Sequence, residues 1–247
     1  MISNIILIKD KDDTDAYHFR IDMHHTSSFQ NLDNCTRQIL IDLYEDYFYS
    51  RQNDFWKKEA MEKLPVLKDA TNMLVCGEDL GMVPVCVPDV MQQLNFLSLE
   101  IQRMPKNSSS RFSNLAYVPY LSVVSPSTHD LSTIRGWWEE DRSITQQFYN
   151  DELKQTGTAP YFCEPWINEK IVEQHLKSPA MWAIFQLQDI LGIDSNIRRQ
   201  MPQEERINVP ANSNHYWNYR MHINLEDLIE ASAFNEKLKM LISQSGR

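Results

Sequence analysis

The stretch MLVCGEDLG, at positions 73–81, ends an apolar run with two adjacent carboxylates, and a glycine closes it. Residues 73–76 predict a short buried strand, and the polar residues at 77–81 predict the turn that follows it. Glu78 and Asp79 then belong either to an ordinary polar turn or to the edge of an active site. The remainder of the chain has to decide between these two interpretations.

Further segments repeat this pattern of an apolar run that ends on polar side chains. They are LSLEIQRM at 97–104, YLSVVSPSTHD at 120–130 and SPAMWAIFQLQDILGI at 178–193. The polar residues near their ends are Glu100, His129, Asp130, Gln188 and Asp189. Helical patterns between the strands indicate a parallel sheet with crossover helices, which is an α/β fold. In a (β/α)8 barrel, catalytic groups lie at the carboxyl ends of several strands, as these residues would.

Apolar side chains at three- and four-residue spacing predict the helices. These are expected at 36–64, from 88 onward, at 135–153, at 168–176 and at 225–242. Pro65 is expected to end the first of them. The opening residues MISNIILI predict a strand and not a signal peptide, because they lack a basic region and a small-residue cleavage site. No apolar stretch is long enough to span a membrane.

The overall composition narrows the classes of function. Of the 247 residues, 42% are hydrophobic and 23% are charged, which is typical of a globular protein. The net charge of −10 disfavours nucleic acid or an anionic membrane as a partner and suits a neutral substrate. The four cysteines show no CxxC spacing and no histidine at metal-ligand spacing. We therefore expect reduced thiols in a cytoplasmic protein, and no metal site.

Paired carboxyl groups suit the cleavage of a glycosidic bond. One carboxyl group protonates the leaving oxygen, and a second attacks the anomeric carbon or activates water. Glu78 and Asp130 are far apart in the sequence, but a barrel would bring them to the same mouth. The structural alternatives stay open at this point. Either carboxylate is also a typical cap of a following helix, and His129 alone is more often a structural hydrogen-bond partner.

Several motifs resemble those of glycoside hydrolase family 77, the 4-α-glucanotransferases that include amylomaltase and the disproportionating enzymes. They are GEDLGMVP at 77–84, LSLEIQRMP at 97–105 and STHDLSTIRGWW at 127–138, followed in the same order by LQDILGI at 187–193 and ERINVPANSNHYWNYR at 205–220. The resemblance covers roughly residues 36 to 243. It is nearest to the long branch of the family, of the plant cytosolic and Bacteroides type.

This resemblance implies the C-terminal portion of a (β/α)8 TIM barrel with helical insertions specific to the family. It implies that Glu78 is the general acid/base and that Asp130 is the carboxylate that stabilises the transition state. His129 would contact the sugar next to the scissile bond. Trp138, or its neighbour Trp137, is expected to stack on a glucose ring. The implied substrates are α-1,4-glucans and maltooligosaccharides, and no metal or organic cofactor is implied.

Two further carboxylates near the motifs have less direct interpretations. Asp79 is expected to be a hydrogen-bonding residue that orients the turn. Glu100 either acts in the site or pairs with Arg103.

A retaining transglycosylase also needs a nucleophilic aspartate, which the family carries in an Arg-Ile-Asp context before the glutamate. FRID at 19–22 makes Asp22 a candidate, but the residues that follow lack the expected His-plus-glycine continuation. We therefore expect the nucleophile upstream, with residues 1–35 an atypical lead-in. Residues 1–247 would then be the C-terminal part of a catalytic barrel without its first half. The rival hypotheses are an inactive barrel remnant that only binds glucan, and a hydrolase of the α-amylase type.

Overall fold

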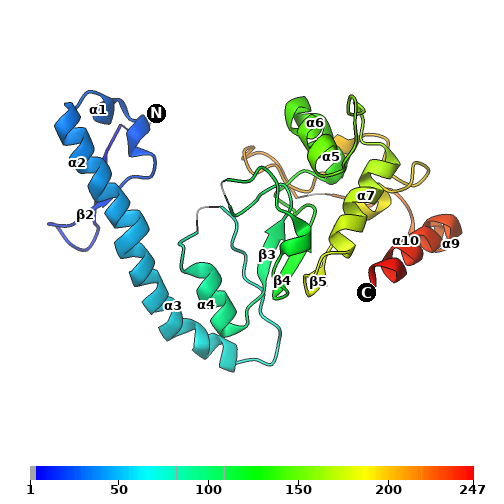
Figure 1. Ribbon diagram of the computed structural model, residues 1–247, viewed down its shortest axis with the longest axis horizontal. Coiled ribbons are helices and arrows are strands. Elements are labelled where there is room, and N and C mark those ends of the chain that lie inside the picture. The colour runs from blue at the N-terminus through cyan, green and yellow to red at the C-terminus, as the bar shows by residue number, and fades with distance from the viewer. Residues whose placement is uncertain (1–3, 82, 108, 218) are drawn as a thin grey trace. The chain divides into compact units, whose positions relative to one another are not determined.

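The computed structural model describes residues 4–81, 83–107, 109–217 and 219–247. Its chain divides into two compact units (Figure 1). The first holds residues 1–73 and 82–94, and the second holds residues 74–81 and 95–247. Among the described helices, none combines the length and the hydropathy that crossing a membrane requires.

The first unit starts with a small hairpin and continues into a long helical segment. Its elements are β1 (Leu7–Lys9), β2 (Tyr17–Phe19), a 3-10 helix (Met23–His25), α1 (Ser27–Gln30), α2 (Asn34–Glu45), a π-helical segment (Asp46–Arg51), α3 (Gln52–Asp69) and α4 (Val87–Leu94). β1 and β2 pair antiparallel, and α2 to α3 run as one continuous helical stretch. The predicted strand at the start, the helix at 36–64 and the helix beginning near Pro88 are confirmed.

Pro65, the predicted end of the long helix, lies inside α3. The prediction is wrong because the helix continues beyond it. Proline lacks the N–H that would bond the carbonyl four residues earlier, here that of Met61, so the helix loses one hydrogen bond without ending. Ala70 closes the last turn by donating its N–H to the carbonyls of Val66 and Leu67, at 3.2 and 3.3 Å.

The second unit is built on a parallel sheet. β3 (Ser98–Ile101) pairs in parallel with β4 (Ser122–Ser125), and β4 pairs in parallel with β5 (Trp182–Ala183), as Figure 1 shows. Cys76 forms a parallel bridge with Leu97, immediately before β3. Four segments of the chain therefore lie side by side in the same direction. This confirms the predicted parallel α/β arrangement.

The predicted strand at 73–76 is reduced to that bridge. Gly77 donates its N–H to the carbonyl of Leu97 at 2.8 Å, which fastens the segment to the sheet. Met73 and Leu74 are 77% and 49% exposed, so the prediction that this strand is buried is wrong. Its apolar side chains lack a neighbouring element to cover them among the residues that the structure describes.

Helices follow the strands of the second unit. They are α5 (Ile134–Glu140), α6 (Arg142–Asp151), α7 (Pro165–Leu176), α8 (Leu187–Leu191), α9 (Leu225–Glu230) and α10 (Ser232–Ser245), with short 3-10 helices at Leu115–Tyr117 and Pro202–Glu205. The predicted helix at 135–153 is split at Asp141. The carboxylate of Asp141 caps α6 by accepting hydrogen bonds from the N–H groups of Ser143 and Ile144, at 2.8 and 3.1 Å.

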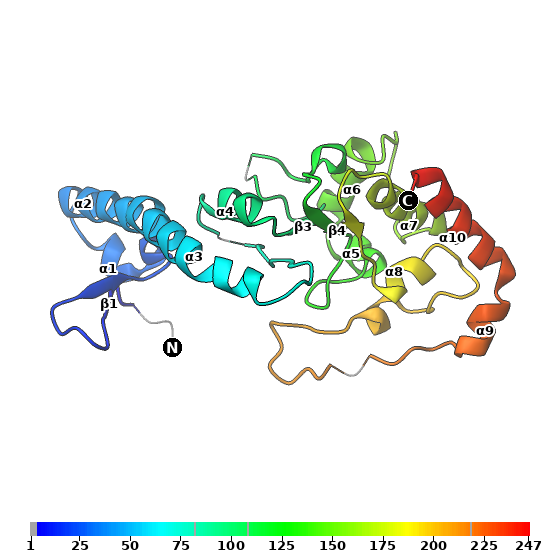
Figure 2. The same cartoon turned by 90° about the horizontal axis from the view of Figure 1, so that it is seen from below.

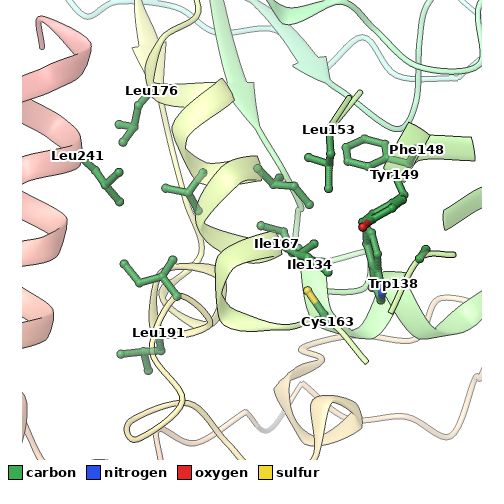
Figure 3. Close-up of a cluster of buried hydrophobic side chains, with 14 of the residues drawn as sticks. Ile134, Trp138, Phe148, Tyr149, Leu153, Cys163, Ile167, Leu176, Leu191 and Leu241 are labelled. Atoms are coloured by element: carbon green, nitrogen blue, oxygen red, sulfur yellow. The ribbon is translucent and has the colours of Figure 1, made fainter. Parts of the chain in front are cut away.

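The hydrophobic core of the second unit lies between α5, α6, α7 and α10. Figure 3 shows part of it, with Leu176 on α7 and Leu241 on α10 among its members. The view in Figure 2 likewise shows α10 alongside α7. Because the helices that follow β4 and β5 are anchored in this core, the loops at the ends of those strands have a fixed support.

α7 carries a completely buried histidine, His175. Its Nδ1 donates a hydrogen bond to the carbonyl of Ile171 at 2.7 Å. Burial lowers the pKa of the imidazole from 6.5 to about 4, because the charged form is poorly solvated in the core. The unfolded chain therefore binds a proton between these pH values that the folded protein does not bind. The contribution that neutral His175 makes to the free energy of unfolding is therefore fully present above pH 6.5. It is lost as the pH falls towards 4.

Replacing this residue, His175→Gln, is expected to flatten the pH dependence of stability because glutamine does not titrate. Between pH 6.5 and 4 the wild type should lose roughly 3 kcal/mol of unfolding free energy that the variant keeps. Urea unfolding at several pH values measures this difference. The matched control is His25→Gln, at an exposed position, which should keep the wild-type dependence. Parallel curves for the wild type and His175→Gln would contradict the assignment.

Candidate active site

Three of the predicted site residues, Glu78, His129 and Asp130, lie at one edge of the parallel sheet. Glu78 follows the bridge at Cys76, and His129 and Asp130 lie in the turn after β4. β3 lies between these two segments, and neighbouring parallel strands have their carboxyl ends at the same edge. Glu78, His129 and Asp130 are all exposed to solvent. The fold thus presents two carboxylates and an imidazole where ligands of α/β sheets bind.

The adjacent carboxylates Glu78 and Asp79 have different surroundings. Glu78 is exposed and accepts one hydrogen bond, from the N–H of Leu80 at 2.8 Å. Asp79 is only 3% exposed, accepts a hydrogen bond from the N–H of Leu99 at 2.9 Å, and lies 2.6 Å from Nζ of Lys106. Asp79 therefore fastens the turn to β3, which confirms its predicted structural role. Glu78 is left free to face a ligand.

Lys106 also holds Glu100, which is buried. Its Nζ lies 2.8 Å from Oε1 of Glu100, and the hydroxyl of Ser98 donates to the same oxygen at 3.1 Å. The suggested pairing of Glu100 with Arg103 is wrong, since Lys106 takes that place. A single ammonium group thus compensates the charges of two buried carboxylates, Asp79 and Glu100.

Removing this ammonium group, by Lys106→Met, is expected to destabilise the protein by about 3 kcal/mol, because two buried carboxylates lose their counter-ion. Urea unfolding at pH 7 measures the change. The control is Lys177→Met, which removes an exposed partner of Glu173 while Lys170 remains in place, and should cost below about 1 kcal/mol. A similar small effect of both substitutions would contradict this account of the turn.

Asp130 is held by groups from two parts of the chain. Its Oδ1 accepts a hydrogen bond from Nδ2 of Asn208 at 2.7 Å, and its Oδ2 lies 3.3 Å from Nε2 of His129. The imidazole of His129 lies against the indole of Trp217, with ring centroids 4.8 Å apart. We call His129, Asp130, Asn208 and Trp217 the Asp130 cluster. The side chains of His129 and Asp130 are about half exposed, as groups that contact a ligand must be.

Asn208 and Trp217 are members of this cluster that the sequence analysis did not single out. Both belong to the segment 205–220, which was noted only for its resemblance to the family. The signal that could have found Trp217 is local. Its aromatic ring stands in an irregular stretch where no helical or strand pattern would bury it, and it is 61% exposed.

Buried polar groups support the turn that carries His129 and Asp130. Asp189, in α8, is buried and accepts hydrogen bonds from the hydroxyl of Ser127 and, at 2.7 Å, from the N–H of Ile134. The pKa of the Asp189 carboxyl is raised, because the effect of burial exceeds the lowering by these hydrogen bonds. Asp189 therefore joins the two ends of the turn, and its side chain does not face solvent as Glu78 and Asp130 do.

A second buried group ties the same turn to the segment after α8. The carboxylate of Glu205 pairs with the guanidinium of Arg135 and accepts a hydrogen bond from the hydroxyl of Thr133 at 3.0 Å. Nε2 of Gln188 donates to the backbone carbonyl of Glu205 at 3.0 Å. Gln188 and Asp189, both noted as polar residues after an apolar run, are thus supports of the turn.

Trp138 does not lie at this edge. Its side chain is fully buried in the core, and its indole N–H donates to the carbonyl of Pro160 at 3.0 Å. The prediction that Trp138 stacks on a sugar is wrong, because further chain packed around this unit would only bury it more. Trp137, which precedes it, is partly buried and packs against the same core.

Asp22 lies in the first unit, whereas Glu78 and Asp130 lie in the second. It follows β2, a strand of an antiparallel hairpin, and not a strand of the parallel sheet. Its φ of 60° places it in the left-handed region. These features are those of a turn residue, and they do not match the strand position that the family's nucleophile occupies.

The four cysteines of the chain are free thiols. The thiols of Cys35 and Cys76 are exposed, and those of Cys86 and Cys163 are buried, with no disulfide among them. Burial raises the pKa of the Cys163 thiol. Within the described ranges, no group of three or more His, Cys, Asp or Glu side chains is arranged to hold a metal ion.

Comparison with known proteins decides the family. The family model of glycoside hydrolase family 77, described as 4-alpha-glucanotransferase, matches residues 15–226. The chain belongs to this 4-alpha-glucanotransferase family. The match includes the turn of Glu78, the turn of Asp130 and the segment that carries Asn208 and Trp217.

Named relatives within the family are longer than this chain. It is 40% identical to 4-alpha-glucanotransferase DPE2 of Oryza sativa subsp. japonica over 247 residues, which is 100% of this chain and 26% of that protein. It is 32% identical to a 4-alpha-glucanotransferase of Chlamydia muridarum over 192 residues, 74% of this chain and 35% of that protein. The chain thus spans about a third or less of these relatives.

A solved structure shows the same fold. An amylomaltase from Streptococcus agalactiae, in complex with acarbose, superposes with a TM-score of 0.58 at 18% identity. The superposition covers 76% of this chain and 35% of the amylomaltase chain. At this level of identity the similarity concerns the fold.

Proposed function

We propose that this chain is part of a retaining 4-α-glucanotransferase, which moves α-1,4-glucan segments from a donor to the 4-OH of an acceptor glucan or glucose. The observation that carries the proposal is the exposure of Glu78 and Asp130 at one edge of a parallel sheet, in a chain of this family. Two carboxyl groups that flank a glycosidic bond are the usual requirement of such chemistry.

Glu78 is the proposed general acid/base. In the first step its carboxyl proton goes to the glycosidic oxygen as the bond from that oxygen to C1 breaks, and a carboxylate nucleophile bonds to C1. In the second step the ionised Glu78 takes the proton of the acceptor 4-OH, whose oxygen attacks C1 and releases the nucleophile. Glu78 is exposed, so a substrate oxygen can come within hydrogen-bond distance of its carboxyl group.

The Asp130 cluster is the proposed binding site for the sugar ring that reacts. The carboxylate of Asp130 stabilises the positive charge that develops on this ring, and it accepts hydrogen bonds from its hydroxyl groups. Asn208 and His129 flank the carboxylate and hold it in place. Trp217 replaces Trp138 as the proposed aromatic contact, because Trp217 is exposed and lies against His129.

We further propose that residues 1–247 form the C-terminal part of a larger (β/α)8 catalytic barrel, with the helices of the first unit as an insertion. The short coverage of the relatives supports this. The sheet supports it too, since Trp182 and Ile184, at its β5 edge, are 50% and 51% exposed. The nucleophile would then come from a strand that precedes the turn of Glu78, and not from Asp22.

The proposed substrates are neutral α-1,4-glucans and maltooligosaccharides. The net charge of −10 suits such substrates better than nucleic acid or an anionic membrane. The free thiols of Cys35 and Cys76, both exposed, support a reducing compartment such as the cytoplasm.

The test is a disproportionation assay with the protein in the longest form that its gene encodes, here called the intact protein. Incubated with maltotriose and isotope-labelled glucose, it should produce a ladder of maltooligosaccharides, with the label in the acceptor position. Glucose release that does not depend on the acceptor would indicate a hydrolase. Binding of maltotriose without any redistribution would indicate an inactive remnant. Either result would contradict the proposal.

A further inference from the structure

A small polar pocket lies next to the Asp130 cluster in the second unit. Its volume is about 160 Å³, and Arg103, Ser132, Trp137, Glu140 and Arg206 are among the residues that line it. Arg103 lies in the turn after β3, and Ser132 belongs to the turn after β4, so this Arg103 pocket opens at the edge of the sheet where the site lies. Arg206 connects the pocket to the cluster, since its Nε donates to the carbonyl of Asn208 at 2.8 Å.

The lining of the Arg103 pocket presents both donors and acceptors. Oε1 of Glu140 accepts a hydrogen bond from the hydroxyl of Ser132 and lies 3.4 Å from Nη1 of Arg206. Arg103 donates to the carbonyl of Ser132, while its Nε is buried and has no hydrogen-bond partner within the part of the chain that the structure describes. Its guanidinium lies 5.4 Å from the centre of the Trp137 ring.

These groups match the chemistry of a neutral sugar better than that of an anion. Guanidinium groups donate to hydroxyl oxygens, a carboxylate accepts from hydroxyl hydrogens, and an aromatic ring packs against C–H groups. Burial lowers the pKa of the Arg103 guanidinium to about 10, and the nearby Arg206 acts in the same direction, while the carboxylates of Glu140 and Asp189 offset this lowering only in part. An acidic ligand would also meet the negative charge of Glu140, which lines the pocket and would repel it.

The size of the pocket limits the ligand further. A volume of about 160 Å³ is below the ~300–1,000 Å³ typical of pockets for drug-sized molecules. It suits one six-membered ring and not a longer segment of glucan.

We propose that the Arg103 pocket binds one glucosyl ring of an α-glucan, in a subsite that adjoins the ring held by the Asp130 cluster. Arg103 and Arg206 donate hydrogen bonds to the oxygens of this ring, Glu140 accepts from its hydroxyl groups, and Trp137 supplies the apolar wall. The proposal rests on the proposed function, because it takes the glucan as the substrate.

The test compares two pocket variants, Glu140→Gln and Arg206→Gln, in the intact protein. Each should weaken maltose binding by about 10-fold or more in isothermal titration calorimetry, which is the effect of losing a hydrogen bond to a charged group. Each should also raise KM for maltose more than it lowers kcat, because the pocket acts on binding. Arg206→Lys keeps a positive donor and should recover part of the lost affinity.

The matched controls change the same residue types away from the pocket. Glu173→Gln alters an ion pair on α7, and Arg111→Gln alters an exposed arginine, so both should keep the wild-type affinity for maltose. Unfolding midpoints show whether each variant remains folded. Glu140 and Arg206 are partly exposed, so neither substitution leaves a fully buried charge unpaired.

Several outcomes would contradict the proposal that the Arg103 pocket binds a glucosyl ring. They are unchanged maltose affinity and KM in both pocket variants, an equal loss in the controls, no maltose binding by the wild type, or an effect on the affinity for inorganic phosphate and not for maltose. Normal glucan transfer together with the first outcome would leave the proposed function standing. Conversely, maltose binding that depends on Glu140 in a protein without transfer activity would refute the proposed function but would support the proposed sugar binding by the pocket.

Discussion

Replacing the proposed acid/base, by Glu78→Gln, is expected to lower the rate of glucan transfer by about 10²–10⁴-fold, the usual contribution of a positioned acid or base. Glutamine keeps the shape of the side chain and can still accept the hydrogen bond from Leu80, but it cannot donate a proton to the leaving oxygen. Maltose should still bind. Transfer from maltotriose to labelled glucose, followed over time in the intact protein, measures the loss.

The control for this substitution is Glu236→Gln, at an exposed position on α10. It removes one negative charge from the same unit and should leave the transfer rate unchanged. A transfer rate of Glu78→Gln close to that of the control would show that another residue is the acid.

Replacing the second carboxylate, by Asp130→Asn, is expected to lower kcat by about 10²–10³-fold, as the loss of one preorganised stabilising group typically does. The amide can no longer offset the positive charge of the sugar ring, although it can still bond to Asn208. Because that charge exists only in the transition state, kcat should fall much more than maltose affinity. Steady-state kinetics and calorimetry on the same preparation separate the two effects.

Asp151→Asn serves as the control for Asp130, since Asp151 is exposed at the end of α6. It should keep the wild-type kcat. An equal decrease in affinity and in kcat/KM for Asp130→Asn, with kcat preserved, would assign Asp130 to ground-state binding.

The strands β3 and β4 and the positions of the two carboxylates could be predicted from the sequence because their signals are local. The apolar runs of β3 and β4 are short, are rich in residues that suit a buried sheet, and end on polar groups. The runs therefore predict strands, and the polar groups predict the edge of the sheet at which the site lies. Glu78 follows the apolar stretch at 73–76, and Asp130 lies in the turn after β4. The motifs around these residues indicated the family, and the family implied the chemical role of each carboxylate.

The errors have a common cause, which is packing between distant segments. Helical spacing places Trp137 and Trp138 on α5 but does not say which ring the core takes, and the core takes Trp138. The contact between Asn208 and Asp130 joins an irregular segment to a strand end, and no periodic pattern predicts it. Pro65 does not end α3, because the neighbouring turns of the helix compensate the single hydrogen bond that the proline removes.

The most direct test of the central claim, that Glu78 is the acid/base, uses α-maltosyl fluoride as the donor with Glu78→Gln in the intact protein. Fluoride leaves without protonation, so the first step no longer needs the acid, whereas the second step still needs the base. The account predicts a rapid burst of fluoride, about one per enzyme molecule, followed by slow turnover, and almost no cleavage of maltotriose. Fluoride release as impaired as maltotriose cleavage, with no burst, would contradict it.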